Sequence, residues 1–273
     1  MEIFTLNVGQ GQFVAVTGNT EAFIVDTYLP LNPEVEIVNV KAALAAILPG
    51  KNLIGLMVTG FDADHFNEIG LKLVLNKYRP DWIMYPKYFK ETGNARTCFA
   101  AIKSFERQKS EFRKISMDLS DNDKRFYYKL SNDFTFELFS PHRDDMTSSN
   151  NCSLVCKVEE KATGRSYLIT GDTEGDRWDS IVYYFDSSLA STVLAAPHHG
   201  SVNGISEVAI ASISPHTVLI SAGVDNQYGH PDIEAMRLFR KYATDVWQTN
   251  ARDGQSLRTV VTAQGVRSYK FEP

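Results

Sequence analysis

Most residues with the chemistry of a reactive site lie in four short polar segments, each of which follows a segment expected to be a strand. These segments are Thr59-Gly60-Phe61-Asp62-Ala63-Asp64-His65, Gly171-Asp172-Thr173, Pro197-His198-His199-Gly200-Ser201 and Asn226-Gln227-Tyr228-Gly229-His230-Pro231. Loops at strand ends can converge on one rim of a sheet. Carboxylates and imidazoles that meet there suit a divalent cation such as Zn, Mn or Fe, and such an ion activates water for hydrolysis near neutral pH. Two adjacent ions could hold both sides of a phosphodiester.

Taken singly, each segment also has an interpretation without chemistry. Asp62 and Asp64 could form a turn or cap the helix expected from Phe66, and Asp172 could cap the helix that follows it. The two adjacent histidines could be a surface pair. Capping alone does not readily explain a strand followed by D-x-D-H, a later strand followed by G-D, and a third followed by P-H-H-G-S. The combination of the three therefore favours a functional site.

The hydrophobic pattern predicts the elements that must position these segments. Strands are expected at residues 3–8, 13–17, 22–26, 53–58, 82–85, 134–139, 153–158, 166–170, 192–196 and 217–221, with a hairpin of strands near residue 273. Helices are expected at residues 35–48, 66–78, 96–114, 177–185, 205–213 and 233–242. Two β-rich halves, each followed by helices, predict an α/β (α+β) protein with two sheets packed face to face and helices outside them. We expect this four-layer αββα sandwich to form one domain over residues 1–273.

Composition and charge exclude several classes of function. The formal net charge is −5, so the chain as a whole cannot hold nucleic acid through bulk positive charge. No apolar run approaches the roughly 20 residues of a membrane span, and residues 1–12 lack the features of a signal peptide, so we expect a cytoplasmic protein without membrane contact. Cys98, Cys152 and Cys156 show no C-x-x-C spacing, which argues against a disulfide framework or a thiolate zinc site.

Basic residues gather in the helix expected at 96–114, and a basic-aromatic stretch follows at residues 124–129. Basic residues interleaved with aromatic ones can guide a nucleic-acid backbone. However, Glu106 and Glu111 interrupt the run, and such runs are more often the solvated face of a helix. We favour the solvated face.

The order of motifs resembles the metallo-β-lactamase fold hydrolases, and within them the soluble relatives of the hydrolase domain attached to the bacterial DNA-uptake (competence) channel of ComEC type. The motifs that carry the resemblance are, in order, Leu6-Asn7-Val8-Gly9-Gln10-Gly11, Phe23-Ile24-Val25-Asp26-Thr27, Asn151-Cys152-Ser153-Leu154-Val155, Gly171-Asp172, Ala196-Pro197-His198-His199-Gly200-Ser201 and Tyr228-Gly229-His230-Pro231. They span nearly the whole chain. The resemblance implies the metallo-β-lactamase sandwich and a divalent metal, Mn or Zn, bound as one or two ions.

The metal motif departs from the pattern of this family. The family reads H-x-[HD]-x-D-H where this chain reads Gly60-Phe61-Asp62-Ala63-Asp64-His65, so a glycine replaces the first histidine. The ligand sets implied are Asp62, the bridging Asp172 and water for the first ion, and Asp64, His65, Asp172 and either His198 or His199 for the second. Asn7 and Gln12 also stand where acidic residues are common in this branch, which lowers the negative charge near the site.

Two functions remain open on this basis. In the first, the protein is a metal-dependent hydrolase of phosphodiester bonds in nucleic acid or a nucleotide, with an impaired first metal position. Asp62 or Asp64 would then accept a proton from water, and His230 would donate a hydrogen bond to a phosphoryl oxygen or protonate a leaving group. His230 could equally be a buried, hydrogen-bonded residue.

In the second function, loss of the histidine at Gly60 leaves an inactive protein that binds a partner protein or a nucleotide. We favour the hydrolase, because the chain retains more of the metal ligands than it has lost.

Overall fold

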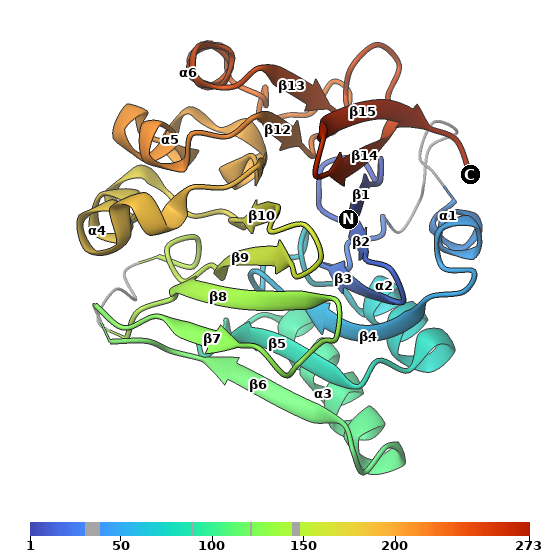
Figure 1. Ribbon diagram of the computed structural model, residues 1–273. Coiled ribbons are helices and arrows are strands. Elements are labelled where there is room, and N and C mark those ends of the chain that lie inside the picture. Colours follow the sequence, from blue (N-terminus) through green and yellow to red (C-terminus); the bar gives the residue numbers. More distant parts are fainter. Residues whose placement is uncertain (31–38, 89, 121, 144–147) are drawn as a thin grey trace.

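The computed structural model describes residues 1–30, 39–88, 90–120, 122–143 and 148–273. It contains two β-sheets that pack face to face, with helices on the outer side of each sheet (Figure 1). The four-layer αββα sandwich expected from the sequence is therefore confirmed.

The first sheet has eight strands in the order β15-β14-β1-β2-β3-β4-β5-β6. Its strands are β1 (Glu2–Thr5), β2 (Val14–Thr17), β3 (Glu21–Val25), β4 (Asn52–Met57), β5 (Trp82–Pro86), β6 (Arg113–Met117), β14 (Ser256–Thr262) and β15 (Gly265–Phe271). Strands β1, β2 and β3 pair antiparallel, whereas β3, β4, β5 and β6 pair parallel. The carboxyl ends of β3 and β4 consequently lie at the same edge of the sheet.

The second sheet has seven strands in the order β13-β12-β11-β10-β9-β8-β7. Its strands are β7 (Arg125–Tyr127), β8 (Phe134–Ser140), β9 (Val155–Glu160), β10 (Ser166–Ile169), β11 (Val193–Ala195), β12 (Thr217–Ile220) and β13 (Asp245–Gln248). Strands β10 to β13 pair parallel, so the loops that follow β10, β11 and β12 also share one edge.

The helices divide between the two outer faces. Helices α1 (Val40–Ile47), α2 (Glu68–Leu73) with the π-helical turn η1 (Val74–Tyr78), and α3 (Gly93–Gln108) pack on the first sheet. Helices α4 (Gly175–Phe185), α5 (Glu207–Ile213) and α6 (Ile233–Tyr242) pack on the second, with the short turns η2 (Asp186–Leu189), η3 (Pro197–Gly200) and η4 (Val202–Gly204) between them. The first part of the helix expected at 35–48 falls on residues 35–38, which lie outside the described residues.

The interior between the sheets is formed by side chains that alternate along each strand. In β5, Trp82 and Met84 face the opposite sheet, whereas Ile83 between them faces the helices. The Trp82 ring meets Phe136 of the second sheet with ring centroids 5.5 Å apart, and Phe23 lies 5.4 Å from the same Phe136 ring. This alternation is the period of two that distinguishes a half-buried strand from a helix.

The helix expected at 96–114 is wrong at its carboxyl end, since α3 stops at Gln108 and Arg113 begins strand β6. In β6, Ile115 and Met117 are buried while the residue between them is exposed, which is the pattern of a strand that pairs with β5 at the sheet edge. Three basic residues of this segment form ion pairs at the surface, namely Arg96, Lys109 and Lys114. Lys114 lies 2.7 Å from Glu106, as expected for a solvated, charged surface.

The strands β7 and β13 were not anticipated, and the C-terminal hairpin joins the first sheet beside β1 rather than extending the second. Cys98, Cys152 and Cys156 are all buried. Among the described residues, no helix is both long and apolar enough to cross a bilayer.

Candidate metal centre

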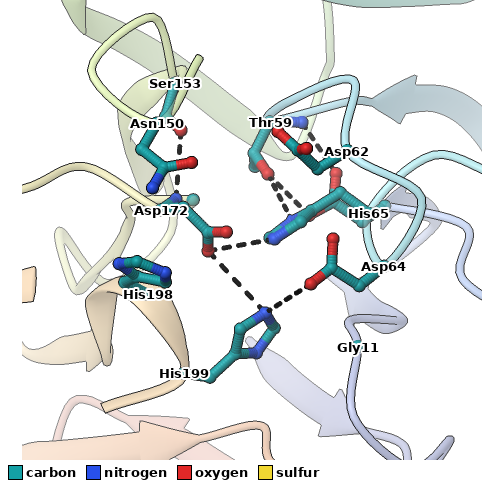
Figure 2. A network of polar contacts seen from close by, with 12 residues as sticks. Gly11, Thr59, Asp62, Asp64, His65, Asn150, Ser153, Asp172, His198 and His199 are labelled. Atoms are coloured by element: carbon teal, nitrogen blue, oxygen red, sulfur yellow. Dashed lines mark hydrogen bonds and ion pairs between the residues drawn. The ribbon is translucent and has the colours of Figure 1, made fainter. Parts of the chain in front are cut away.

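Loops from both sheets meet at the carboxyl ends of their strands (Figure 2). Asp26 directly follows β3, and the Thr59–His65 segment, residues 59–65, follows β4. From the second sheet, Asp172 follows β10, and the two adjacent histidines at 198–199 follow β11. Four of the side chains predicted as metal ligands are brought together in this way from segments far apart in the chain.

Asp64, His65, Asp172 and His199 form a compact group that could hold a metal ion, with one ligand atom from each residue within 4.8 Å of the others. His65 Nε2 lies 2.9 Å from Asp172 Oδ1. His199 Nε2 lies 3.7 Å from Asp172 Oδ1 and 3.6 Å from Asp64 Oδ2. Two imidazole nitrogens and two carboxylates are a donor set suited to Zn or Mn. We call these four residues the metal cluster.

The atoms at the centre of the metal cluster lack other partners. His65 Nε2, Asp172 Oδ1 and His199 Nε2 are buried, and none has a partner in hydrogen-bond geometry among the described residues. Buried polar atoms in folded proteins are nearly always hydrogen-bonded. Three such atoms aimed at one point therefore fit a site that binds a cation.

Outer contacts fix the direction of both imidazoles. His65 Nδ1 lies 2.8 Å from Asp26 Oδ2, and Asp26 in turn accepts hydrogen bonds from the Thr59 hydroxyl (2.6 Å) and the Thr59 amide (2.7 Å). His199 Nδ1 donates to the Ser221 carbonyl oxygen at 2.7 Å. Each ring is thereby held with Nε2 facing the metal cluster, the arrangement in which a carboxylate or carbonyl orients a metal-binding histidine.

The carboxylates and imidazoles of the metal cluster stabilise each other's charged forms. Burial alone would raise the pKa of Asp172, but the His65 and His199 imidazoles beside it hold that pKa below its usual value. Burial alone would lower the pKa of His65, but the Asp172 and Asp26 carboxylates raise that pKa well above its usual value. The same carboxylates favour a divalent cation at this point, because a bound cation, like a protonated imidazole, places positive charge beside them.

The backbone before Asp172 requires a glycine. Gly171 has a φ of +53°, and a Cβ there would lie 2.9 Å from the side chains of Thr59 and Ser153. The Asp172 amide then donates to Ser153 Oγ at 3.0 Å. Ser153 belongs to the N-x-S-L-V segment of the sequence, so this motif positions the carboxylate at the junction of the two sheets.

The opening glycine turn supports the loop that carries Asp64. The Gln12 amide donates to the Asp64 carbonyl oxygen at 2.8 Å. A Cβ on Gly11 would lie 2.7 Å from the same Asp64 oxygen and 2.2 Å from the Tyr28 ring, so only glycine permits this approach. The motif at residues 6–11 therefore contributes to the site through backbone packing.

Two predicted ligands lie outside the metal cluster. Asp62 forms an ion pair with Lys90. His198 lies with Nδ1 3.7 Å from Glu174 Oε1, whereas the adjacent His199 points into the metal cluster. Both histidines have left-handed backbones, with φ of +49° and +54°, which turn the two side chains to different surroundings.

His230 lines a cavity of about 520 Å³ that opens over the metal cluster, together with Asp62, Asp64, Asp172, His199 and Tyr228. Its ring stacks on Tyr228, with centroids 5.8 Å apart and an interplanar angle of 17°. Burial, and then the nearby His198 and His199 rings, lower the pKa of His230. A neutral imidazole at this point can donate one N–H hydrogen bond into the cavity.

Asp26 contacts His65 and was not among the predicted site residues, although it lies in the quoted segment Phe23-Ile24-Val25-Asp26-Thr27. Replacing it with asparagine is expected to lower the affinity for Zn or Mn by roughly 10- to 100-fold, because His65 loses the charged partner that orients it. Titration calorimetry with either metal measures this, and circular dichroism checks the fold. Asp81→Asn, at an exposed ion pair with Lys109, is the matched control. Unchanged metal affinity in folded Asp26→Asn protein would show that Asp26 does not support the site.

No protein-family model matches the chain. Two curated relatives do: ComE operon protein 3 of Bacillus subtilis (strain 168) is 28% identical over 201 residues, covering 73% of this chain and 24% of that protein. Competence protein ComA of Neisseria gonorrhoeae is 31% identical over 139 residues, covering 50% of this chain and 20% of that protein. The chain therefore spans about a quarter or less of the length of these relatives.

Solved structures share the fold at low sequence identity. The metallo hydrolase Igni18 of the archaeon Ignicoccus hospitalis superposes with a TM-score of 0.52 at 12% identity, with 100% of both chains covered. Yeast PDE1 superposes with a TM-score of 0.50 at 10% identity, covering 90% of this chain and 96% of that one. Together with the strand-end motifs, these likenesses identify the chain as a protein of the metallo-β-lactamase fold. Within that fold it is a distant homologue of ComE operon protein 3 and ComA, the competence proteins of ComEC type.

Proposed function

We propose that this protein is a metal-dependent hydrolase of phosphodiester bonds, in nucleic acid or a nucleotide, that works with one divalent ion. The observation that carries the proposal is the metal cluster itself, four potential ligand side chains beside a cavity, three of which have a buried polar atom without a hydrogen-bond partner. A catalytic ion usually has about three protein ligands and an open position, and this set of four residues offers at least that number. The distant homology to competence proteins, together with the resemblance of the motifs to the hydrolase domain of a DNA-uptake channel, supports a phosphodiester as the substrate.

In the proposed reaction, the residues around the cavity have different roles. A bound divalent ion would polarise the scissile phosphate and the attacking water. Asp64, with its side chain 30% exposed toward the cavity, is better placed to accept the proton of water than Asp62, which is paired with Lys90. His230, which lines the same cavity, would donate a hydrogen bond to a phosphoryl oxygen. The bond from water oxygen to phosphorus forms as the bond from phosphorus to the leaving oxygen breaks, and that oxygen takes a proton from solvent.

A second candidate is an inactive protein that keeps the fold to bind a protein partner or a nucleotide. The observation that favours it is the absence of a side chain at Gly60, next to an Asp62 that is already paired. The double variant Asp64→Ala/His65→Ala separates the two functions. An inactive binding protein would keep its partner and its biological activity in this variant, whereas a hydrolase would lose its activity.

Metal-loaded protein is expected to retain about one Mn or Zn per chain after gel filtration and to hydrolyse bis-p-nitrophenyl phosphate, with chelation abolishing the reaction. Elemental analysis and absorbance of p-nitrophenolate measure the two quantities, and DNA serves as a second substrate. Asp64→Ala/His65→Ala protein purified in parallel controls for contaminating enzymes. If the wild-type chain retains no stoichiometric ion and cleaves neither substrate, the proposal fails.

A further inference from the structure

Lys90 provides a positive charge beside Asp62, a residue that lines the cavity over the metal cluster. Its ammonium forms an ion pair with Asp62 and lies 3.3 Å from Ser149 Oγ, to which it donates a hydrogen bond. Asp62 comes from the loop that also carries Asp64 and His65 (Figure 2). Its side chain is 29% exposed and that of Lys90 is 32% exposed, so the pair is partly shielded from solvent.

The cavity has an excess of carboxylates that a phosphodiester must approach. Asp62, Asp64 and Asp172 all line it, and a phosphodiester is itself an anion. The metal cluster offers a place for positive charge beside Asp64 and Asp172, but it does not include Asp62. Among the described residues, the positive charge that contacts Asp62 is the ammonium of Lys90.

Protein ligands for a second ion are scarce beside Asp62. Gly60 offers no side chain, although a Cβ there would have room, because the nearest heavy atom outside its neighbours is Ser153 Oγ at 3.9 Å. A catalytic metal position usually takes about three protein ligands. The Lys90 ammonium therefore lies beside Asp62, where the chain offers too few ligands to bind a second ion.

We propose that the Lys90 ammonium takes the place of a second metal ion and is a further catalytic residue, which donates a hydrogen bond to a non-bridging oxygen of the phosphodiester. The inference rests on the proposed hydrolase function. Lys90 makes and breaks no covalent bond. Its ammonium stabilises the negative charge that builds up on the phosphoryl oxygens as water attacks, which is the role of a positively charged clamp in phosphoryl transfer.

The first test measures catalysis and phosphate binding in wild-type, Lys90→Met and Lys90→Arg proteins, each loaded with Mn. Lys90→Met is expected to retain one ion per chain but to lose on the order of 100-fold in kcat/KM for bis-p-nitrophenyl phosphate, as for other preorganised donors. Inhibition by inorganic phosphate should weaken in parallel. Lys90→Arg keeps the charge and should stay within about tenfold of wild type. The matched control is Lys87→Met, which removes an exposed lysine that pairs with Asp118 and should change neither quantity.

The second test counts ions without using activity. Gly60→His alone is expected to bind one Mn per chain, because Lys90 still occupies Asp62. Gly60→His/Lys90→Met is expected to bind two, because a histidine, Asp62 and Asp172 are then free to act as ligands. Elemental analysis after gel filtration gives both numbers.

The outcomes separate the two proposals. If wild type hydrolyses the substrate and Lys90→Met matches Lys87→Met in kcat/KM and in phosphate inhibition, the Lys90 inference is overturned while the hydrolase stands. Equal ion counts in Gly60→His protein with and without Lys90 would also contradict it. A wild-type chain that binds no ion and hydrolyses nothing would overturn both proposals.

Discussion

Asp172→Asn protein is expected to bind Zn or Mn with an affinity reduced by more than the roughly 100-fold that loss of an outer-shell partner can cost. A single carboxylate atom, Asp172 Oδ1, faces both ligand imidazoles, at 2.9 Å from His65 Nε2 and 3.7 Å from His199 Nε2. Asparagine keeps the shape of the side chain but removes the charge that offsets a cation. Hydrolysis of bis-p-nitrophenyl phosphate should fall to the level of the Asp64→Ala/His65→Ala protein.

Titration calorimetry and steady-state kinetics measure these effects. The matched control is Asp118→Asn, which neutralises a carboxylate paired with Lys87 away from the metal cluster and should leave both quantities within about twofold. Metal affinity and hydrolysis close to wild type in folded Asp172→Asn protein would exclude Asp172 from the site.

Trp82→Ala protein is expected to lose about 3–5 kcal/mol of unfolding free energy, the usual cost of truncating a large buried aromatic side chain. Trp82 is 2% exposed and packs between the sheets, where its ring lies 5.5 Å from Phe136 and 6.4 Å from Phe23. The variant therefore opens a cavity at the contact that joins the two halves of the sandwich. Urea unfolding followed by circular dichroism measures the change.

Tyr183→Ala is the control for this prediction, since Tyr183 is 82% exposed on helix α4. Its unfolding free energy should stay within about 0.5 kcal/mol of wild type. A loss below about 1 kcal/mol in Trp82→Ala protein would show that the aromatic contact between the sheets contributes little to stability.

Much of the fold could be predicted from the sequence because strands and helices differ in period. The alternation in β5 and the helical spacing in α6 (Ile233–Tyr242) are local patterns that packing reinforced. The segment at 109–114, where strand β6 begins, is predicted as helix because charged residues at a sheet edge resemble the polar face of a helix. Its strand character depends on pairing with β5, which is a contact that local sequence does not report.

The candidate site was predictable only in part for the same reason. The order of D-x-D-H, G-D and H-H motifs indicated which residue types could converge. It could not show which of His198 and His199 faces the metal cluster, because that depends on the left-handed backbone at both positions and on the bond from His199 to the Ser221 carbonyl. The contact between Lys90 and Asp62 likewise joins separate loops, and none of the motifs in the sequence contains Lys90.

The most direct test of the central claim is an anomalous-difference map from crystals of this protein soaked in Zn, recorded at the zinc absorption edge. We expect one strong peak about 2.0–2.2 Å from an atom of each of Asp64, His65, Asp172 and His199, with the Lys90 ammonium still beside Asp62. A map with no peak among these four side chains, under conditions in which zinc enters the crystal, would contradict it.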